Sequence, residues 1–284
     1  MNQLELNKNS DYPRIETSVD DFKEFRLEKN LLVDKSKSLN LSMLKYFFEL
    51  EVDERGELLS PAERSNDKLF ADLEISEDQK SMEEQGKYPV ILFNLKNTKG
   101  ESYQEIENEI KDRVIKLFAD HLYLEDCLKP DYKLLSSAQK DKLSRYFSGN
   151  INKTDLHTSL VFLSELLYKR FNQKVILLID EYDETINDAY VKFGHESKEF
   201  ERILYLIAKI LGNALKSNNT YLKKAVLIGI LKIAKANIFS GLNNVAEYGL
   251  LNKRFTEYYG FTQNEVDNLL TKVPLIIDKN EVKE

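Results

Sequence analysis

The chain has 284 residues, which is enough for one large domain or two small ones with a substantial core. Its formal net charge of −7 argues against a global basic surface for nucleic acid, although a local basic patch is left open. The single cysteine, Cys127, excludes an internal disulfide framework. The polar start of the chain and the lack of an apolar run of about 20 residues predict a cytoplasmic protein that does not bind membranes.

The first half of the chain predicts a helix and a strand separated by loop. Residues 1–20 are polar and lack a hydrophobic period, which predicts a poorly ordered lead-in. From Leu39, apolar residues at helical spacing predict a helix, and the charged, irregular stretch 51–87 predicts mainly loop. The apolar run Pro89–Leu95 then predicts a strand, because a proline can begin a strand but cannot continue a central one.

The second half predicts helices that alternate with strands. Two continuous apolar runs, Val175–Asp180 and Ala225–Ile230, predict strands buried on both faces. Strands separated by helices of this length predict an α/β fold with a mostly parallel sheet flanked by helices. Apolar side chains that step by three or four residues predict helices over 103–118, 138–147, 156–171 and 200–215.

The segment KVILLIDEYDE, Lys174–Glu184, carries the most chemical information. Ligands of parallel sheets gather at the carboxyl ends of the strands, so Asp180 is placed to offer an oxygen ligand to Mg²⁺. Glu181 is placed to act as a general base on an attacking water. Asp183 and Glu184 add negative charge that we expect to be solvated. The alternative is a strand that simply ends in an acidic turn, and the flanking strand, helix and second strand favour the nucleotide-hydrolase interpretation.

The sequence contains no glycine loop for phosphates. A P-loop reads G-x-x-x-x-G-K-[ST], because the glycines let backbone N–H groups cradle the phosphates. None of the 10 glycines is followed by Lys and then Ser or Thr, and no G-x-G-x-x-G is present. The three histidines, His121, His157 and His195, lack the spacing of zinc ligands.

Several segments together resemble the bacterial AAA-ATPase-like proteins, many of which carry a PD-(D/E)XK nuclease-like domain after the NTPase domain. The similar segments include the stretch Asp20–Ser36, the Walker B-like VILLIDEYDE, and Leu227–Val245 with its IFSGLNN. The resemblance implies a P-loop NTPase core of the ASCE type over residues 21–284, with ATP and Mg²⁺ as cofactors. No carboxylate cluster with E-x-K spacing stands out, so nuclease activity is not assigned.

The resemblance also implies an internal deletion. In relatives, a segment like LLVDKS is followed by a helix, a strand and a glycine-containing loop, whereas here Ser36 runs directly into Lys37 and Ser38. Lys37 and Ser38 match by position the lysine and hydroxyl that hold the nucleotide phosphates in the family, without the loop that would orient them. The first core strand is therefore expected to be missing.

Two departures in the second buried strand weaken the case for ATP turnover. Ile228 replaces a sensor-like hydroxyl of the family, and Lys232 replaces an arginine whose planar bidentate contact a lysine cannot make. With the first strand deleted, we expect the strands at 175–180 and 225–230 to pair directly or the domain to pack loosely. Direct pairing would narrow the crevice above Asp180.

Three functions follow from these observations, in decreasing order of support. The first is an AAA-ATPase-like domain derived from an ATP-binding NTPase and now weak or inactive. The second is a non-catalytic interaction module that recruits a protein partner or a homologous intact chain. The third is a working Mg²⁺-dependent ATPase with an unrecognised phosphate loop.

Overall fold

The computed structural model describes residues 21–27, 37–229, 246, 248 and 262–272. The chain divides into two compact units, residues 1–40 with 246–284, and residues 41–245. The first unit contains the short helix α1 (Phe22–Leu27) and the helix α9 (Gln263–Lys272). The predicted lead-in over residues 1–20 lies outside the described residues, so the proposed domain boundary after it stays a prediction.

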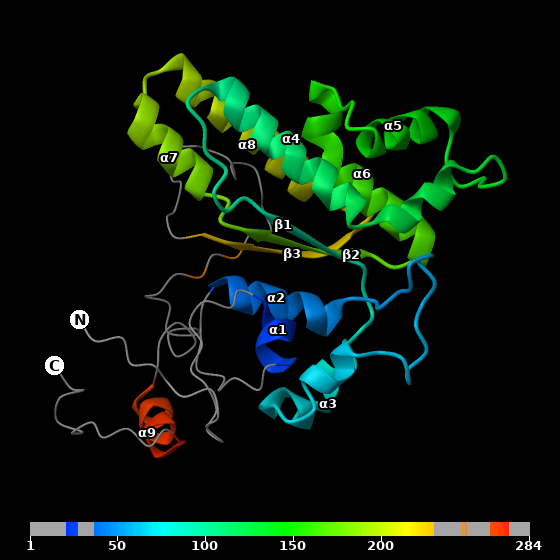
Figure 1. Ribbon diagram of the computed structural model, residues 1–284, viewed down its shortest axis with the longest axis vertical. Helices are drawn as coiled ribbons and strands as arrows, with labels where there is room; N and C mark the ends of the chain where they lie inside the picture. Colours follow the sequence, from blue (N-terminus) through cyan, green and yellow to red (C-terminus); the bar gives the residue numbers. More distant parts are fainter. Residues whose placement is uncertain (1–20, 28–36, 230–245, 247, 249–261, 273–284) are drawn as a thin grey trace, which may run out of the picture. The chain divides into compact units, whose positions relative to one another are not determined.

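A parallel sheet forms the centre of the second unit (Figure 1). Its described strands are β1 (Val90–Asn94), β2 (Val175–Asp180) and β3 (Leu222–Ile228), in the order β1-β2-β3. The central strand β2 is buried along its whole length, as its continuous apolar run predicts. The predicted α/β fold, with a parallel sheet flanked by helices, is confirmed.

The helices predicted from hydrophobic spacing are present in the structure. The helix expected from Leu39 and the four expected after residue 100 correspond to α2, α4, α5, α6 and α8. The helix α7 was not predicted, because it begins inside the acidic turn that follows β2. The helices and 3₁₀ helices of this part of the chain are α2 (Lys37–Phe48), η1 (Asn66–Leu69), η2 (Glu74–Glu77), α3 (Gln79–Met82), α4 (Tyr103–Ala119), η3 (Leu122–Leu128), α5 (Ser137–Phe147), α6 (Lys153–Phe171), α7 (Glu184–Phe193) and α8 (Lys198–Lys216).

Alternate side chains of β2 enter two different cores, because successive residues of a strand point to opposite faces. Leu177 and Ile179 belong to the large core that the sheet shares with α4, α6 and α8. Ile176 and Leu178 pack instead with Leu41 of α2. Figure 1 shows this arrangement, with α4, α6 and α8 on one side of the sheet and α2 on the other. The sheet is therefore covered on both faces, which explains why β2 carries no polar residue before its end.

The third strand corrects one prediction. The segment Ala225–Ile230 was expected to be buried on both faces, but Lys223 and Lys224 of β3 are exposed and the residues that follow them in the strand are only partly buried. The reason is position: β3 pairs with β2 along one side and forms an edge of the sheet over the described residues. Ile230 lies outside the described residues.

The expected direct pairing of the strands predicted at 175–180 and 225–230 is confirmed over the described residues. Leu178 lies opposite Val226, and Asp180 lies opposite Ile228, in a parallel register. This pairing does not test the expected deletion, because it leaves the other side of β3 untouched. The missing first strand therefore stays a prediction. Among the described residues, no helix combines the length and the apolar character that crossing a membrane requires.

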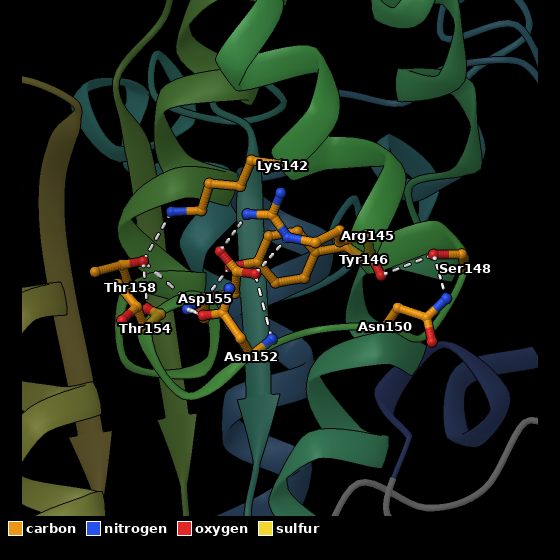
Figure 2. A network of polar contacts seen from close by, with 9 residues as sticks. All are labelled: Lys142, Arg145, Tyr146, Ser148, Asn150, Asn152, Thr154, Asp155 and Thr158. Atoms are coloured by element: carbon orange, nitrogen blue, oxygen red, sulfur yellow. Dashed lines mark hydrogen bonds and ion pairs between the residues drawn. The ribbon is translucent and has the colours of Figure 1, made fainter.

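An ion pair between a buried carboxylate and a partly exposed guanidinium fixes the junction between α5 and α6 (Figure 2). Arg145 donates from Nε and Nη2 to the two carboxylate oxygens of Asp155, at 2.7 and 2.9 Å. Asn152 and Asp155 form a reciprocal capping box at the start of α6, and the Tyr146 hydroxyl donates to the Asp155 carbonyl at 2.6 Å. Burial opposes ionisation of Asp155, yet these bonds from Arg145 and Asn152 lower the pKa of its carboxyl.

Candidate functional site

The last residues of the three strands lie side by side at the carboxyl edge of the sheet. Asn94 ends β1, Asp180 ends β2, and Ile228 ends β3, and the strand register places them side by side. Asp180 is almost fully buried, with 1% of its surface exposed, and the Asn94 side-chain amide donates to its Oδ2 at 3.5 Å. The strand-end carboxylate therefore lies between an amide and an aliphatic side chain, at the edge where parallel sheets bind ligands.

Glu181 has an unusual backbone conformation. Its φ is 50°, in the left-handed region that costs a residue with a side chain roughly 1–2 kcal/mol. This conformation turns the chain directly after β2, and the N–H of Glu184 donates to the Glu181 carbonyl at 3.1 Å. The tight turn starts α7 and brings the side chains of Glu181 and Glu184 into a mutual hydrogen bond.

The two glutamates titrate as a pair. Burial, the hydrogen bond to Glu184 and the negative charges of Glu184 and Asp180 raise the pKa of Glu181 to about 7. Burial also acts on Glu184, but hydrogen bonds from Glu181, from the Asn97 N–H and from Lys99 lower its pKa. Two carboxyl groups this close cannot both ionise easily, so near neutral pH the pair shares a proton.

The loop after β1 holds this pair in place. The backbone N–H of Asn97 donates to Glu184 Oε2 at 3.0 Å, and Lys99 Nζ lies 3.1 Å from Oε1 of the same residue. Asn97 itself has a φ of 58°, a conformation that asparagine tolerates better than most residues. The turns that follow β1 and β2 are therefore tied together by one carboxylate.

Asp183 and Glu184 were expected to be solvated, and this expectation is wrong for Asp183. Only 2% of Asp183 is exposed, and Asn187 donates to its Oδ2 at 3.4 Å. A Cβ atom at Gly229, just after β3, would lie 2.6 Å from Asp183 Oδ1 and 2.7 Å from the Tyr182 ring. The turn after β2 packs tightly under the end of β3, and that packing removes Asp183 from water.

The structure describes only the acidic half of the predicted site. Asp180 and Glu181 stand next to each other at the strand end, as expected. Lys37 and Ser38 open the helix α2 and belong to the other compact unit, and their side chains lie outside the described residues. Lys232 also lies outside them.

Asn94 was missed by sequence reasoning. The available signal was a polar residue at the end of the apolar run VILFN, in the same position relative to its strand as Asp180. The pairing of β1 with β2 places Asn94 beside Asp180, because parallel strands end at the same edge of the sheet.

The carboxylate at this edge suits a hard divalent cation better than it suits the phosphates of a nucleotide. Asp180 offers the carboxylate oxygen that Mg²⁺ prefers, whereas Asn94 turns its NH₂ group toward Asp180 and uses its own oxygen to accept the Lys96 N–H at 2.7 Å. Mg²⁺ commonly takes one or two carboxylates and fills its remaining positions with water and phosphate. No group of three or more His, Cys, Asp or Glu side chains among the described residues forms a metal site by itself. The nucleotide phosphates would need backbone N–H donors from a glycine loop, which the sequence lacks.

Comparison with known proteins identifies the family. A family model described as predicted AAA-ATPase matches residues 36–239, well over half of the chain. The chain is also 27% identical over 113 residues to an uncharacterized protein in the vnfD 5′ region of Azotobacter chroococcum mcd 1, a match that covers 39% of this chain and 20% of that protein. No solved structure matches. The family match includes all three strands and the Asp180–Glu181 pair, and the chain belongs to the AAA-ATPase-like family.

Proposed function

We propose that this chain is an AAA-ATPase-like domain that has kept the acidic, Walker B half of an ATPase site and binds ATP weakly or not at all. The missing glycine loop is the observation that carries the proposal, because none of the 10 glycines is followed by Lys and then Ser or Thr. In a working site, Mg²⁺ and a phosphate-binding lysine bring positive charge to this edge, which favours ionised carboxylates. Burial and the neighbouring carboxylates raise the pKa of Glu181 to about 7, and a base whose pKa lies near the working pH suits proton transfer, so we infer that the acidic half keeps the chemistry of such a site.

The phosphate side of the proposal rests on the sequence. No glycine precedes Gly56, so residues 28–36, which run into α2, contain none. A loop without glycine cannot readily turn several N–H groups toward one anion. Each charge-assisted contact to phosphate contributes roughly 1.5–3 kcal/mol, so losing several of them costs many decades of affinity.

Calorimetric titration with ATP in the presence of Mg²⁺ tests the proposal. We expect no saturable heat in the micromolar range. Micromolar, Mg²⁺-dependent binding that Asp180→Asn abolishes would refute the proposal and support a working nucleotide site. Binding that survives Asp180→Asn would refute it too, because ATP would then be held by groups away from the acidic strand end.

A phosphate-release assay separates a remnant from a working ATPase. If the acidic site is a remnant, Glu181→Ala and Asp180→Ala leave any residual release unchanged. Glu109→Ala, an exposed carboxylate on α4, is the matched control. A large loss on Glu181→Ala alone, with the far-ultraviolet circular dichroism spectrum intact, would instead favour the working Mg²⁺-dependent ATPase.

A further inference from the structure

A separate cavity lies at the other end of β1 from Asn94. Its volume is about 240 Å³, and Pro89 and Val90 at the start of the strand contribute to its wall. It is smaller than the roughly 300–1,000 Å³ of pockets that hold drug-sized ligands, so it suits a small one. The side chains that give it chemical character are Lys45, Glu49, Asp120, His121, Tyr123 and Phe171.

Three helices end at this cavity. Lys45 lies in the last turn of α2, Leu117 in the last turn of α4, and Phe171 is the last residue of α6. The carboxyl end of a helix carries a partial negative charge, equivalent to roughly half an electron. The cavity therefore lies where three negative helix ends converge.

Charged side chains reinforce that field. Lys45 Nζ lies 3.7 Å from Glu49 Oε2, so the lysine and this carboxylate largely offset each other. Asp120 directly follows α4 and is exposed, and no described residue forms an ion pair with it. The balance of side-chain charges on the wall is negative and has the same sign as the helix ends.

His121 presents a hydrogen-bond acceptor. Its Nδ1 lies 2.8 Å from the carbonyl oxygen of Leu117, which can only accept, so Nδ1 carries the hydrogen. Burial lowers the pKa of the imidazole, which keeps the ring neutral at neutral pH. Nε2 then holds a lone pair, and no described residue donates to it.

The remaining wall is aromatic. The His121 and Tyr123 ring centroids lie 5.8 Å apart, and the Tyr123 and Phe171 centroids lie 6.0 Å apart, both in edge-to-face arrangements. Aromatic faces attract cations, and more strongly when the cation is removed from water. Leu50 and Leu117 add aliphatic surface for a short carbon chain.

We propose that this cavity binds a small organic cation of the alkylammonium class. The ammonium N–H groups donate to Nε2 of His121 and to the Asp120 carboxylate, and the alkyl chain lies along the aromatic and aliphatic wall. An anion would face the helix ends and the carboxylates, and a neutral apolar molecule would leave Nε2 without a donor. The proposal is independent of nucleotide binding, because the cavity lies at the other end of β1 from the acidic strand end.

Proton–carbon correlation spectra of the histidine rings test this proposal. The full chain is titrated at neutral pH with butylammonium, and butanol and butyrate serve as neutral and anionic ligands with the same carbon chain. We expect butylammonium to shift the His121 signals along a saturating, millimolar curve. His157 and His195 lie outside the cavity and act as internal controls. A His121→Gln variant assigns the signal.

Charge variants sharpen the result. Asp120→Asn should weaken butylammonium binding by about threefold, as expected for an exposed ion pair, and Asp120→Lys should weaken it further. Asp112→Asn removes an exposed carboxylate of α4 that does not line the cavity, and should change nothing. Equal shifts from butanol or butyrate, a butylammonium curve that does not saturate, or unchanged binding in Asp120→Lys would each overturn the proposal.

Discussion

Two polar clusters, one around Asp155 at the α5–α6 junction and one around Glu181 at the end of β2, have opposite electrostatics. At the junction, Asp155 meets the guanidinium fork of Arg145, and its pKa falls. At the strand end, Glu181 meets Glu184, and its pKa rises to about 7. Burial acts to raise the pKa of both acids, so burial alone does not explain the difference. The neighbouring charge decides the outcome: a cation stabilises the ionised acid, whereas a second carboxylate favours its protonated form or the binding of a cation.

The backbone supports the same distinction. Asp155 lies in the first turn of α6, where its capping box with Asn152 stabilises the start of the helix and its bonds from Arg145 join the helix to α5. Glu181 occupies a left-handed conformation that strains the chain. Strain of this kind persists where the surrounding structure enforces it, and it gathers at functional sites. The matched cluster, in which Asp155 faces a cation on a relaxed backbone, is structural. We propose that the mismatched cluster, in which Glu181 faces another acid on a strained backbone, marks a functional site.

The largest expected effect comes from breaking the matched cluster. Arg145→Met leaves the buried Asp155 carboxylate without its bidentate cation, which should lower the free energy of unfolding and the urea midpoint. Urea unfolding measures the loss. Because the pKa of Asp155 is depressed in the folded state, the wild-type advantage is present above about pH 4 and shrinks as the pH falls further.

Arg145→Lys serves as the matched variant. Lysine keeps the charge but cannot donate two parallel bonds, so it should recover only part of the lost stability. Full recovery would mean that charge matters at this junction and bidentate geometry does not. An Arg145→Met variant as stable as the wild type would contradict the structural role assigned to the ion pair.

The second-largest expected effect comes from the close packing of Gly229 against the turn after β2. Gly229→Ala places a Cβ atom 2.6 Å from Asp183 Oδ1, so the turn after β2 must shift. We expect a loss of about 1–3 kcal/mol in the free energy of unfolding, measured by urea titration. Gly212→Ala is the control: no atom lies within 4 Å of its added Cβ, and alanine favours the helix α8. The control should be neutral or stabilising.

Relieving the mismatch should stabilise the protein. In Glu181→Gln, an amide that never ionises takes the place of the carboxyl group that shares a proton with Glu184. A raised pKa means that the folded protein loses stability as the pH rises from about 4.5 to about 7, so the variant should be more stable above that window by about 1 kcal/mol. Thermal melts at about pH 8 and about pH 5 measure the difference, which should vanish at the lower pH.

Glu109→Gln, on the exposed surface of α4, is the control for that comparison and should show no such pH dependence. If Glu181→Gln had the same effect at both pH values, the gain would come from contacts or backbone strain, and the shared proton would lose its support.

The smallest effect concerns the cation beside the pair. Lys99→Met removes an exposed ion-pair partner of Glu184, so the free energy of unfolding should change very little. The titration should respond more clearly, because Glu184 loses a group that lowers its pKa. Carboxyl carbon shifts measured by nuclear magnetic resonance should show the lower of the pair's two apparent pKa values moving upward. An unchanged titration would show that Lys99 does not act on the pair.

The sequence by itself determined the elements and the family. Continuous apolar runs predicted β1 and β2, and helical spacing predicted α4, α5, α6 and α8, because local side-chain patterns reflect which faces must leave water. The same patterns placed Asp180 and Glu181 directly after a buried strand. The absence of a glycine loop is also a property of the sequence alone, since no fold can supply the missing residues.

Only the tertiary structure decided what surrounds those residues. Asn94 is 86 positions away from Asp180 and reaches it through strand pairing. Asp183 is buried because the end of β3 closes over its turn, and β3 is half exposed because it forms an edge of the described sheet. The cavity beside His121 draws its walls from α2, β1, α4 and α6. Burial and pKa depend on neighbours brought together by long-range packing, and a local pattern carries no record of them.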